Sequence, residues 1–221
     1  MKLVKAMATV GGLTAVSRIA GFIRDIMTAS FLGAGPVADA FFVALKLPNF
    51  FRNVTAEGAF SVSFVPLYTE TLQKKGEEEA GRMAGQTFSV MFSILSVFTA
   101  IIVAVMPWVM WAIAPGFEHG EGRYDMAVEF SRVTFPYLLL MSLCALVGGM
   151  LNAHDRFAPF ASTSIYFNLC QIAAMLFFVR FFDNAGQALA WSVTISGFIQ
   201  LGRLLFYLKK YGIRLPILRP H

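Results

Sequence analysis

Seven charged side chains lie in the first two apolar stretches of the chain, where a charge is expensive to bury. The cations are Arg18, Arg24, Lys46 and Arg52, and the anions are Asp25, Asp39 and Glu57. A charge at bilayer depth costs about 2.5 to 3.5 kcal/mol on insertion scales, and such residues usually pair or line a pathway. If each of the three anions pairs with one of the four cations, one cation remains unpaired. Because guanidinium groups bind phosphate oxygens in a two-pronged fashion, this excess indicates a site for an anionic ligand.

A purely structural role is the alternative for the same residues. Arg24 with Asp25, or Arg52 with Glu57, could form internal ion pairs that only hold helices together. The rest of the chain offers little other chemistry. Its three histidines lie in predicted loops or at the end, and its two cysteines lack a CxxC spacing. We therefore predict no catalytic residue, no metal and no cofactor.

The composition is that of a membrane protein, since 57% of the 221 residues are hydrophobic and 14% are charged. Uncharged runs at 83–117, 133–153, 157–179 and 184–202 reach the ~18 residues that mark a spanning helix. The sequence predicts an all-α bundle of six membrane-spanning helices within a single domain, 1–221. Their ranges are 4–32, 36–71, 83–113, 126–152, 159–180 and 186–208. Pro48 removes a backbone donor, so we expect the second helix to break near Leu47 and to hinge there.

Lysine and arginine are distributed unevenly between the two sides of this predicted topology. Of the 18 such residues, eleven lie at the termini or in the loops after the second and fourth helices. They are Lys2, Lys5, Lys74, Lys75, Arg82, Arg156, Arg203, Lys209, Lys210, Arg214 and Arg219. Because cytoplasmic loops carry the excess of positive charge, both termini are predicted to be cytoplasmic. The net charge of +5 therefore reflects topology, and we predict no nucleic-acid partner.

Helical periodicity predicts which way the charges point. One face of the first helix is small and polar, and comprises Gly11, Thr14, Arg18, Gly21, Asp25 and Thr28, with Arg24 at its edge. The opposite face is aliphatic and comprises Val16, Ile19, Ile23, Ile26 and Met27. The second helix repeats Asp39, Phe42, Lys46, Asn49 and Asn53 at helical spacing. We expect both polar faces to meet in a shared interior, with Asn49 bonding backbone groups freed by Pro48. Polar residues of later helices, including Asn168 and Gln171, are predicted to serve packing.

Several segments together resemble the MviN/MurJ family. They are "SRIAGFIRD" (17–25), "GAGPVADAFFVALKLPNFFRNVTAEGAFSVSFVPLYTE" (33–70), "MPWVMWAIAPGF" (106–117), "TFPYLLLMSLCALVGGMLNAHDRF" (134–157) and "ALAWSVTISGFIQL" (188–201). The resemblance implies a lipid II flippase of the multidrug/oligosaccharidyl-lipid/polysaccharide (MOP) exporter superfamily, in the bacterial inner membrane. It implies that undecaprenyl-pyrophosphate-linked precursor moves to the outer leaflet by alternating access. Arg18, Arg24 and Arg52 match the cavity arginines, with Asp25, Asp39 and Glu57 as supporting or gate-forming acids.

The family has two six-helix lobes, whereas this sequence resembles the first lobe only. The resemblance therefore implies that the second lobe is a partner, alongside lipid II and the bilayer. Three other functions stay open. A drug or organic-ion antiporter of the same superfamily would need a net acidic cavity. A membrane enzyme acting on polyprenyl phosphates would need clustered acids or a histidine near the interface. A scaffold of the cell-wall machinery would tolerate loss of the internal charges.

Overall fold

The computed structural model describes residues 2–54, 60–117 and 122–216, and the side chains of 7–50, 63–117 and 122–216. This part of the chain is all-α. Its α-helices are α1 (Lys2–Leu32), α2 (Pro36–Val54), α3 (Phe60–Ala104), α4 (Met106–Ile113), α5 (Gly122–Thr134), α6 (Tyr137–Ala153), α7 (Phe157–Ala161), α8 (Thr163–Ala173) and α9 (Ala185–Lys210). A π-helical turn, η2 (Ala174–Phe178), and a 3₁₀ turn, η3 (Val179–Phe181), extend α8.

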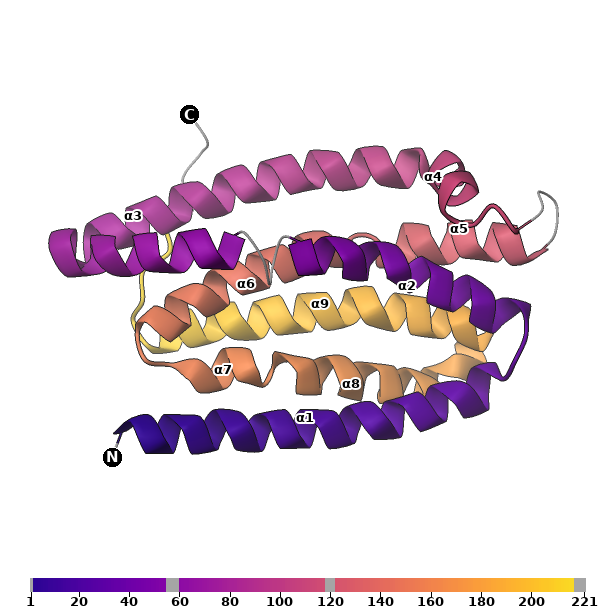
Figure 1. Cartoon of the computed structure of the whole chain (residues 1–221), viewed down its shortest axis with the longest axis horizontal. Coiled ribbons are helices and arrows are strands. Elements are labelled where there is room, and N and C mark those ends of the chain that lie inside the picture. Colours follow the sequence, from indigo (N-terminus) through magenta and orange to yellow (C-terminus); the bar gives the residue numbers. More distant parts are fainter. Residues whose placement is uncertain (1, 55–59, 118–121, 217–221) are drawn as a thin grey trace.

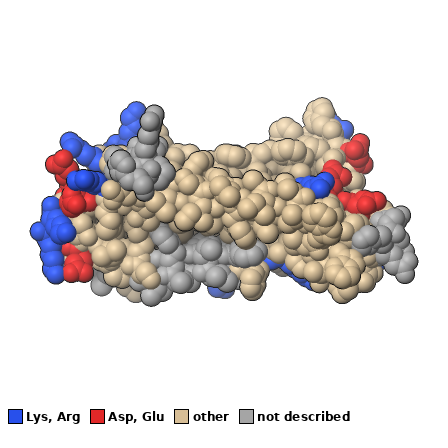
Figure 2. All heavy atoms as spheres, turned by 90° about the horizontal axis from the view of Figure 1, so that it is seen from above, with Lys and Arg blue, Asp and Glu red and all other residues tan. Residues whose placement is uncertain are grey.

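The helices run back and forth along one long axis (Figure 1). Four stretches of the described residues are long and apolar enough to cross a membrane: Ser63–Ala104, Gly122–Ala153, Phe157–Phe181 and Ala185–Lys210. The helices α1 and α2 are outside this set, and they are the two that carry the predicted charged faces. Seen from above in Figure 2, charged atoms gather mainly toward the two ends, with a largely uncharged surface between them. This distribution fits a bundle whose middle lies in hydrocarbon.

Three of the predicted helix boundaries differ from the structure. The loop predicted between 71 and 83 is a single non-helical residue inside α3, Gly76, at φ +86° and ψ 179°. The glutamates that follow are good helix formers, so helical structure resumes at once. Residues 126–152 form two helices, because Pro136 lacks the N–H that would continue α5 into α6. Likewise α3 gives way to α4 just before Pro107.

Pro48, where we expected the helix to break, lies inside α2, and the chain stays helical across it to Val54. A proline at 48 removes the donor for the carbonyl of Ala44, four residues earlier. That carbonyl instead accepts a hydrogen bond from Thr134 Oγ1 at 3.3 Å. Thr134 is fully buried. The freed backbone group thus faces protein, and its donor comes from α5 rather than from Asn49, which we had expected to bond it.

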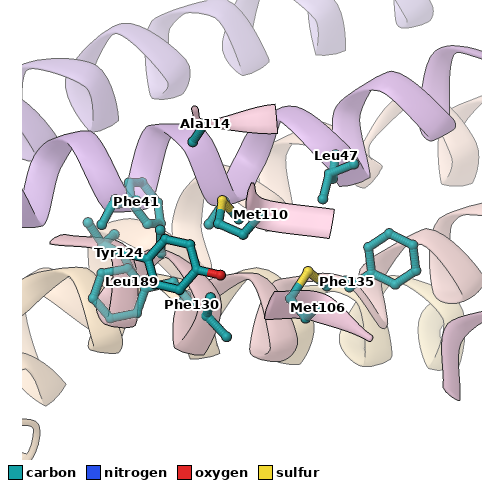
Figure 3. Close-up of a cluster of buried hydrophobic side chains, with 14 of the residues drawn as sticks. Phe41, Leu47, Met106, Met110, Ala114, Tyr124, Phe130, Phe135 and Leu189 are labelled. Carbon is teal, nitrogen blue, oxygen red and sulfur yellow. The ribbon is translucent and has the colours of Figure 1, made fainter. Parts of the chain in front are cut away.

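One hydrophobic core joins α2, α4, α5 and α9. Its large buried side chains are Phe41, Met106, Met110, Tyr124, Phe130, Phe135 and Leu189 (Figure 3). The backbone of α2 approaches closely here because Ala40 and Ala44 are small and fully buried. Gly186 of α9 belongs to the same contact, since an added Cβ would lie 2.7 Å from the Phe130 ring. Small residues therefore set the distance between these helices.

A second core joins α3, α6 and α9 and includes Phe64, Tyr68, Leu143, Leu146, Met150 and Leu204. The segment after α9 covers part of it. Gly212, at φ +70°, turns the chain back, and Ile213 and Leu215 then pack against this core. The carbonyls of Arg214 and Pro216 lie where side chains at Gly81 and Gly85 of α3 would otherwise be. Glycine at both positions is therefore needed for this contact.

Candidate functional site

Arg24 is held by two neighbours. Its Nε and Nη2 donate to Asp25 Oδ1 over 3.0 and 2.6 Å, and its Nη1 donates to Asn168 Oδ1 over 2.9 Å. The guanidinium carbon lies 5.7 Å from the centroid of the Phe167 ring, and 24% of the side chain is exposed. Arginine has five N–H donors. Two of them therefore have no partner among the described residues and can bind an anion.

Asn168 joins α1 to α8 by hydrogen bonds beside this guanidinium. Its Nδ2 donates to the carbonyl of Ser17 over 3.0 Å. Gly21 lies against the same amide, since an added Cβ would be 3.4 Å from Asn168 Nδ2, at van der Waals contact. Farther along α1, the buried Thr28 hydroxyl lies 3.8 Å from Met175 Sδ. The face of α1 that contacts α8 is therefore centred on Gly21, Arg24 and Thr28.

Arg18 and Asp25 are exposed on the surface of the lobe, so our expectation that α1 buries them in the bundle was wrong. The side chain of Asp25 is 66% exposed. Each residue advances the helix by about 100°, so both project to one flank of the face that contacts α8. The aliphatic face is exposed as predicted, with Ile19 at 62%, but Met27 packs against the first core instead.

The polar face of α2 also points away from the core. Lys46 and Asn49 are exposed, and the opposite face carries the buried Phe41 and Leu47. Asp39, also exposed, lies 3.7 Å from Arg123 Nε at the start of α5. No contact between the described residues joins the charges of α1 to those of α2. The shared interior that we expected between them is therefore not formed within this lobe.

Two predicted site residues fall beyond what the structure describes. Arg52 belongs to α2 by its backbone, but its side chain is outside the described set. Glu57 lies in the undescribed segment 55–59. Their predicted roles stay predictions.

Two hollows of the described surface lie away from the predicted site residues. One, of about 330 Å³, lies between α8, η2 and α9 and is lined by apolar residues such as Phe178, Trp191 and Ile199. Another, of about 570 Å³, lies beside Tyr124, Glu129 and Arg132. Neither is lined by a predicted site residue. The exposed charges of α1 and α2 thus lie outside both hollows.

A model of the family described as lipid II flippase MurJ matches residues 28–221. The chain belongs to the MurJ family. A relative from Rhizobium tropici, described as a probable lipid II flippase MurJ, is 39% identical over 224 residues. The alignment covers 100% of this chain and 42% of the relative, so the chain spans less than half the length of that MurJ protein.

Two solved structures share the fold. One is a lipid II flippase MurJ in an inward closed conformation, with a TM-score of 0.70 and 24% identity over 94% of this chain and 43% of that one. The other is a MOP superfamily transporter from Pyrococcus furiosus, with a TM-score of 0.72 and 12% identity over 92% and 44%. Together with the apolar helices, MurJ membership identifies a multi-pass protein of the bacterial inner membrane.

Sequence reasoning missed three residues of this MurJ lobe that form contacts with α1 or α2. Asn168 was predicted to serve packing only, although it bonds Arg24. Thr134 was not singled out, and Arg123 was placed in a loop. Each acts across a large sequence separation, which is 144 residues between Arg24 and Asn168. From the sequence, only the asparagine within an apolar helix indicates a polar contact at Asn168, and this does not tell which residue it contacts.

His154, within the segment "AHDRF" (153–157), contacts a tyrosine of α3. Tyr68 Oη and His154 Nε2 lie 3.1 Å apart and join α3 to the end of α6. Burial lowers the pKa of the His154 imidazole from its ordinary value, and the carboxylate of Glu77 opposes that shift.

The described residues include no group of three or more His, Cys, Asp and Glu placed to hold a metal.

Replacing Thr134 with valine, which has nearly the same shape, should lower the free energy of unfolding by about 1 to 2 kcal/mol, because the Ala44 carbonyl loses its donor. In a Pro48→Ala background the loss should shrink, since residue 48 regains an N–H for that carbonyl. Thermal unfolding of the purified wild type, both single variants and the double variant checks this. Equal losses in both backgrounds would show that Thr134 does not compensate for Pro48.

Proposed function

We propose that this chain forms the N-terminal lobe of a flippase that moves lipid II across the bacterial inner membrane. MurJ membership supports this substrate, and the exposed charges on α1 and α2 support a cavity completed by a second lobe. The observation that carries the proposal is the Arg24 arrangement. A guanidinium held by Asp25 and Asn168 retains two donors for a phosphate.

In this mechanism the cations of α1 and α2 bind the pyrophosphate of the substrate. Arg24 supplies a fixed fork, and Arg18, Lys46 and Arg52 add positive charge along the path. Asp25 orients Arg24, whereas Asp39 and Glu57 form contacts at opposite ends of the path that act as gates. Asn49 contacts the ligand from α2. The two lobes rock around this site, so that it opens to one side of the membrane at a time.

Pro48 allows α2 to bend during this motion, since its missing N–H removes one helical hydrogen bond. No covalent bond needs to form or break, because only the anionic head changes sides while the polyprenyl tail stays in lipid. We therefore infer a transporter without catalytic residues. The membrane potential acts on each charge that moves across the bilayer, by about 2.3 kcal/mol per 100 mV.

An antiporter of organic cations is the runner-up function. Such a transporter needs acidic groups in excess, whereas the seven charges of the first two apolar stretches of the sequence comprise four cations and three anions. A cell-wall scaffold is a second alternative, and it predicts that the internal charges can be lost without consequence.

Depletion of the intact protein, with lipid II measured in each leaflet, tests the proposed function. We expect lipid II to accumulate on the cytoplasmic side within the time that cell-wall synthesis fails. An antiporter or a scaffold would leave the ratio between the leaflets unchanged. That result would overturn the proposal.

Orientation can be tested separately. We propose that the Gly76 turn of α3 and the α6–α7 connection face the cytoplasm, as the positive charges at Lys74, Lys75 and Arg156 indicate. A single cysteine placed at Lys75 in a cysteine-free background should resist an impermeant thiol reagent added to intact cells. A cysteine at Asp183, between η3 and α9, should react. Labelling of the cysteine at 75 from outside the cell would show that the proposed orientation is wrong.

A further inference from the structure

Asn168 contacts the candidate site with both ends of its amide. Its Oδ1 accepts from Arg24 Nη1 at 2.9 Å, and its Nδ2 donates to the Ser17 carbonyl at 3.0 Å. The residue is 5% exposed. Guanidinium groups only donate and backbone carbonyls only accept, so the reverse orientation of the amide would lose both bonds. Asn168 is thus fixed in one orientation by two groups of the same helix.

This amide restricts Arg24 in a way that Asp25 does not. Asp25 follows Arg24 directly, and its side chain is 66% exposed, so the two can move together. Asn168 belongs to α8 and is buried, so it fixes the guanidinium relative to a second helix. Its neutral amide also adds no negative charge. A carboxylate at the same place would give Arg24 two acidic partners and would repel an approaching phosphate.

We propose that Asn168 is a positioning residue, which holds the Arg24 guanidinium so that its two remaining N–H groups face the phosphate of the substrate. This inference rests on the proposed function. It predicts that loss of the amide weakens substrate binding through the orientation of Arg24. Loss of helix packing alone would not have this effect.

The test measures lipid II binding to the intact protein in detergent micelles, alongside thermal unfolding. Asn168→Leu keeps the size of the side chain and removes both hydrogen bonds, and we expect it to weaken binding about tenfold, as loss of a bond to a charged group implies. Asn168→Ser, which is too short to reach Arg24, should do the same and carries the test if the leucine variant does not fold.

Met175→Ala is the matched control. Met175 is 1% exposed and contacts Thr28 between α1 and η2, the turn that extends α8, but the structure gives it no contact with Arg24. It should lower thermal stability at least as much as Asn168→Leu and leave the affinity for lipid II within about twofold. Equal losses of affinity in the Met175 and Asn168 variants would overturn the positioning role.

A double variant separates this inference from the proposed function. In an Arg24→Ala background, Asn168→Leu should have no further effect on affinity, because the group that it positions is gone. A full additional loss would contradict positioning. If Arg24→Ala itself leaves binding unchanged, the proposed function fails. If Arg24→Ala abolishes binding and Asn168→Leu matches wild type, only the role of Asn168 fails.

Discussion

Arg24→Ala should abolish transport in the intact protein while membrane insertion is preserved. Under the proposed function, the substitution removes the two N–H donors that bind the pyrophosphate. It also lowers the cost of placing a charge in the membrane, so insertion is preserved. Arg24→Glu should be at least as severe, because it leaves two adjacent carboxylates beside an anionic substrate. Arg24→Lys should retain partial activity, since the charge remains but the two-pronged geometry is lost. Growth complementation and lipid II binding, with protein levels checked, measure these effects.

Arg180→Ala is the matched control for this series. Arg180 is exposed in η3, and its guanidinium carbon lies 5.1 Å from the ring centroid of its neighbour Phe181, away from the contact between α1 and α8. We expect its removal to leave complementation intact. If Arg24→Ala complements as well as Arg180→Ala does, Arg24 has only a structural role.

The same reasoning separates the two interpretations of Arg52, whose side chain lies outside the described residues. If Arg52 binds the pyrophosphate, Arg52→Ala should remove function whether or not Glu57 is present. If it only neutralises Glu57, the double change to alanine should recover most of the activity, because removing both partners of a buried pair is often nearly neutral. Full rescue by the double variant would end the phosphate-binding role of Arg52.

Residues 1–221 expressed alone should fail to support growth when the intact protein is removed. Their exposed charges, Arg18, Asp25 and Lys46, face away from the lobe's own core and need a protein or water surface opposite them. Co-expression with the second lobe should restore some growth, since the two lobes can then associate. Complementation by 1–221 alone would mean that copies of this lobe assemble with one another into a transporter.

The helical class and the chemical character of each face could be predicted from the sequence. Uncharged runs longer than a bilayer is thick can only be helices in lipid, because every backbone polar group must be bonded within the segment. The cost of burying charge marked Arg24 as a candidate site residue before any fold was known. Proline and glycine also marked real irregularities, although the chain tolerates Pro48 inside α2 and turns at Gly76 alone.

The rotation of α1 and the partners of its charges were decided by tertiary structure. A polar sector about 100° wide does not tell which of its edges packs, and here the edge with Gly21 and Arg24 faces α8 while Arg18 and Asp25 remain exposed. The hydrogen bond from Thr134 to the Ala44 carbonyl, which compensates for Pro48, likewise spans 90 residues. Periodicity reports neighbours within one helix, whereas these contacts depend on how closely two helices can approach. That distance is set jointly by small residues on both, so neither helix determines it alone.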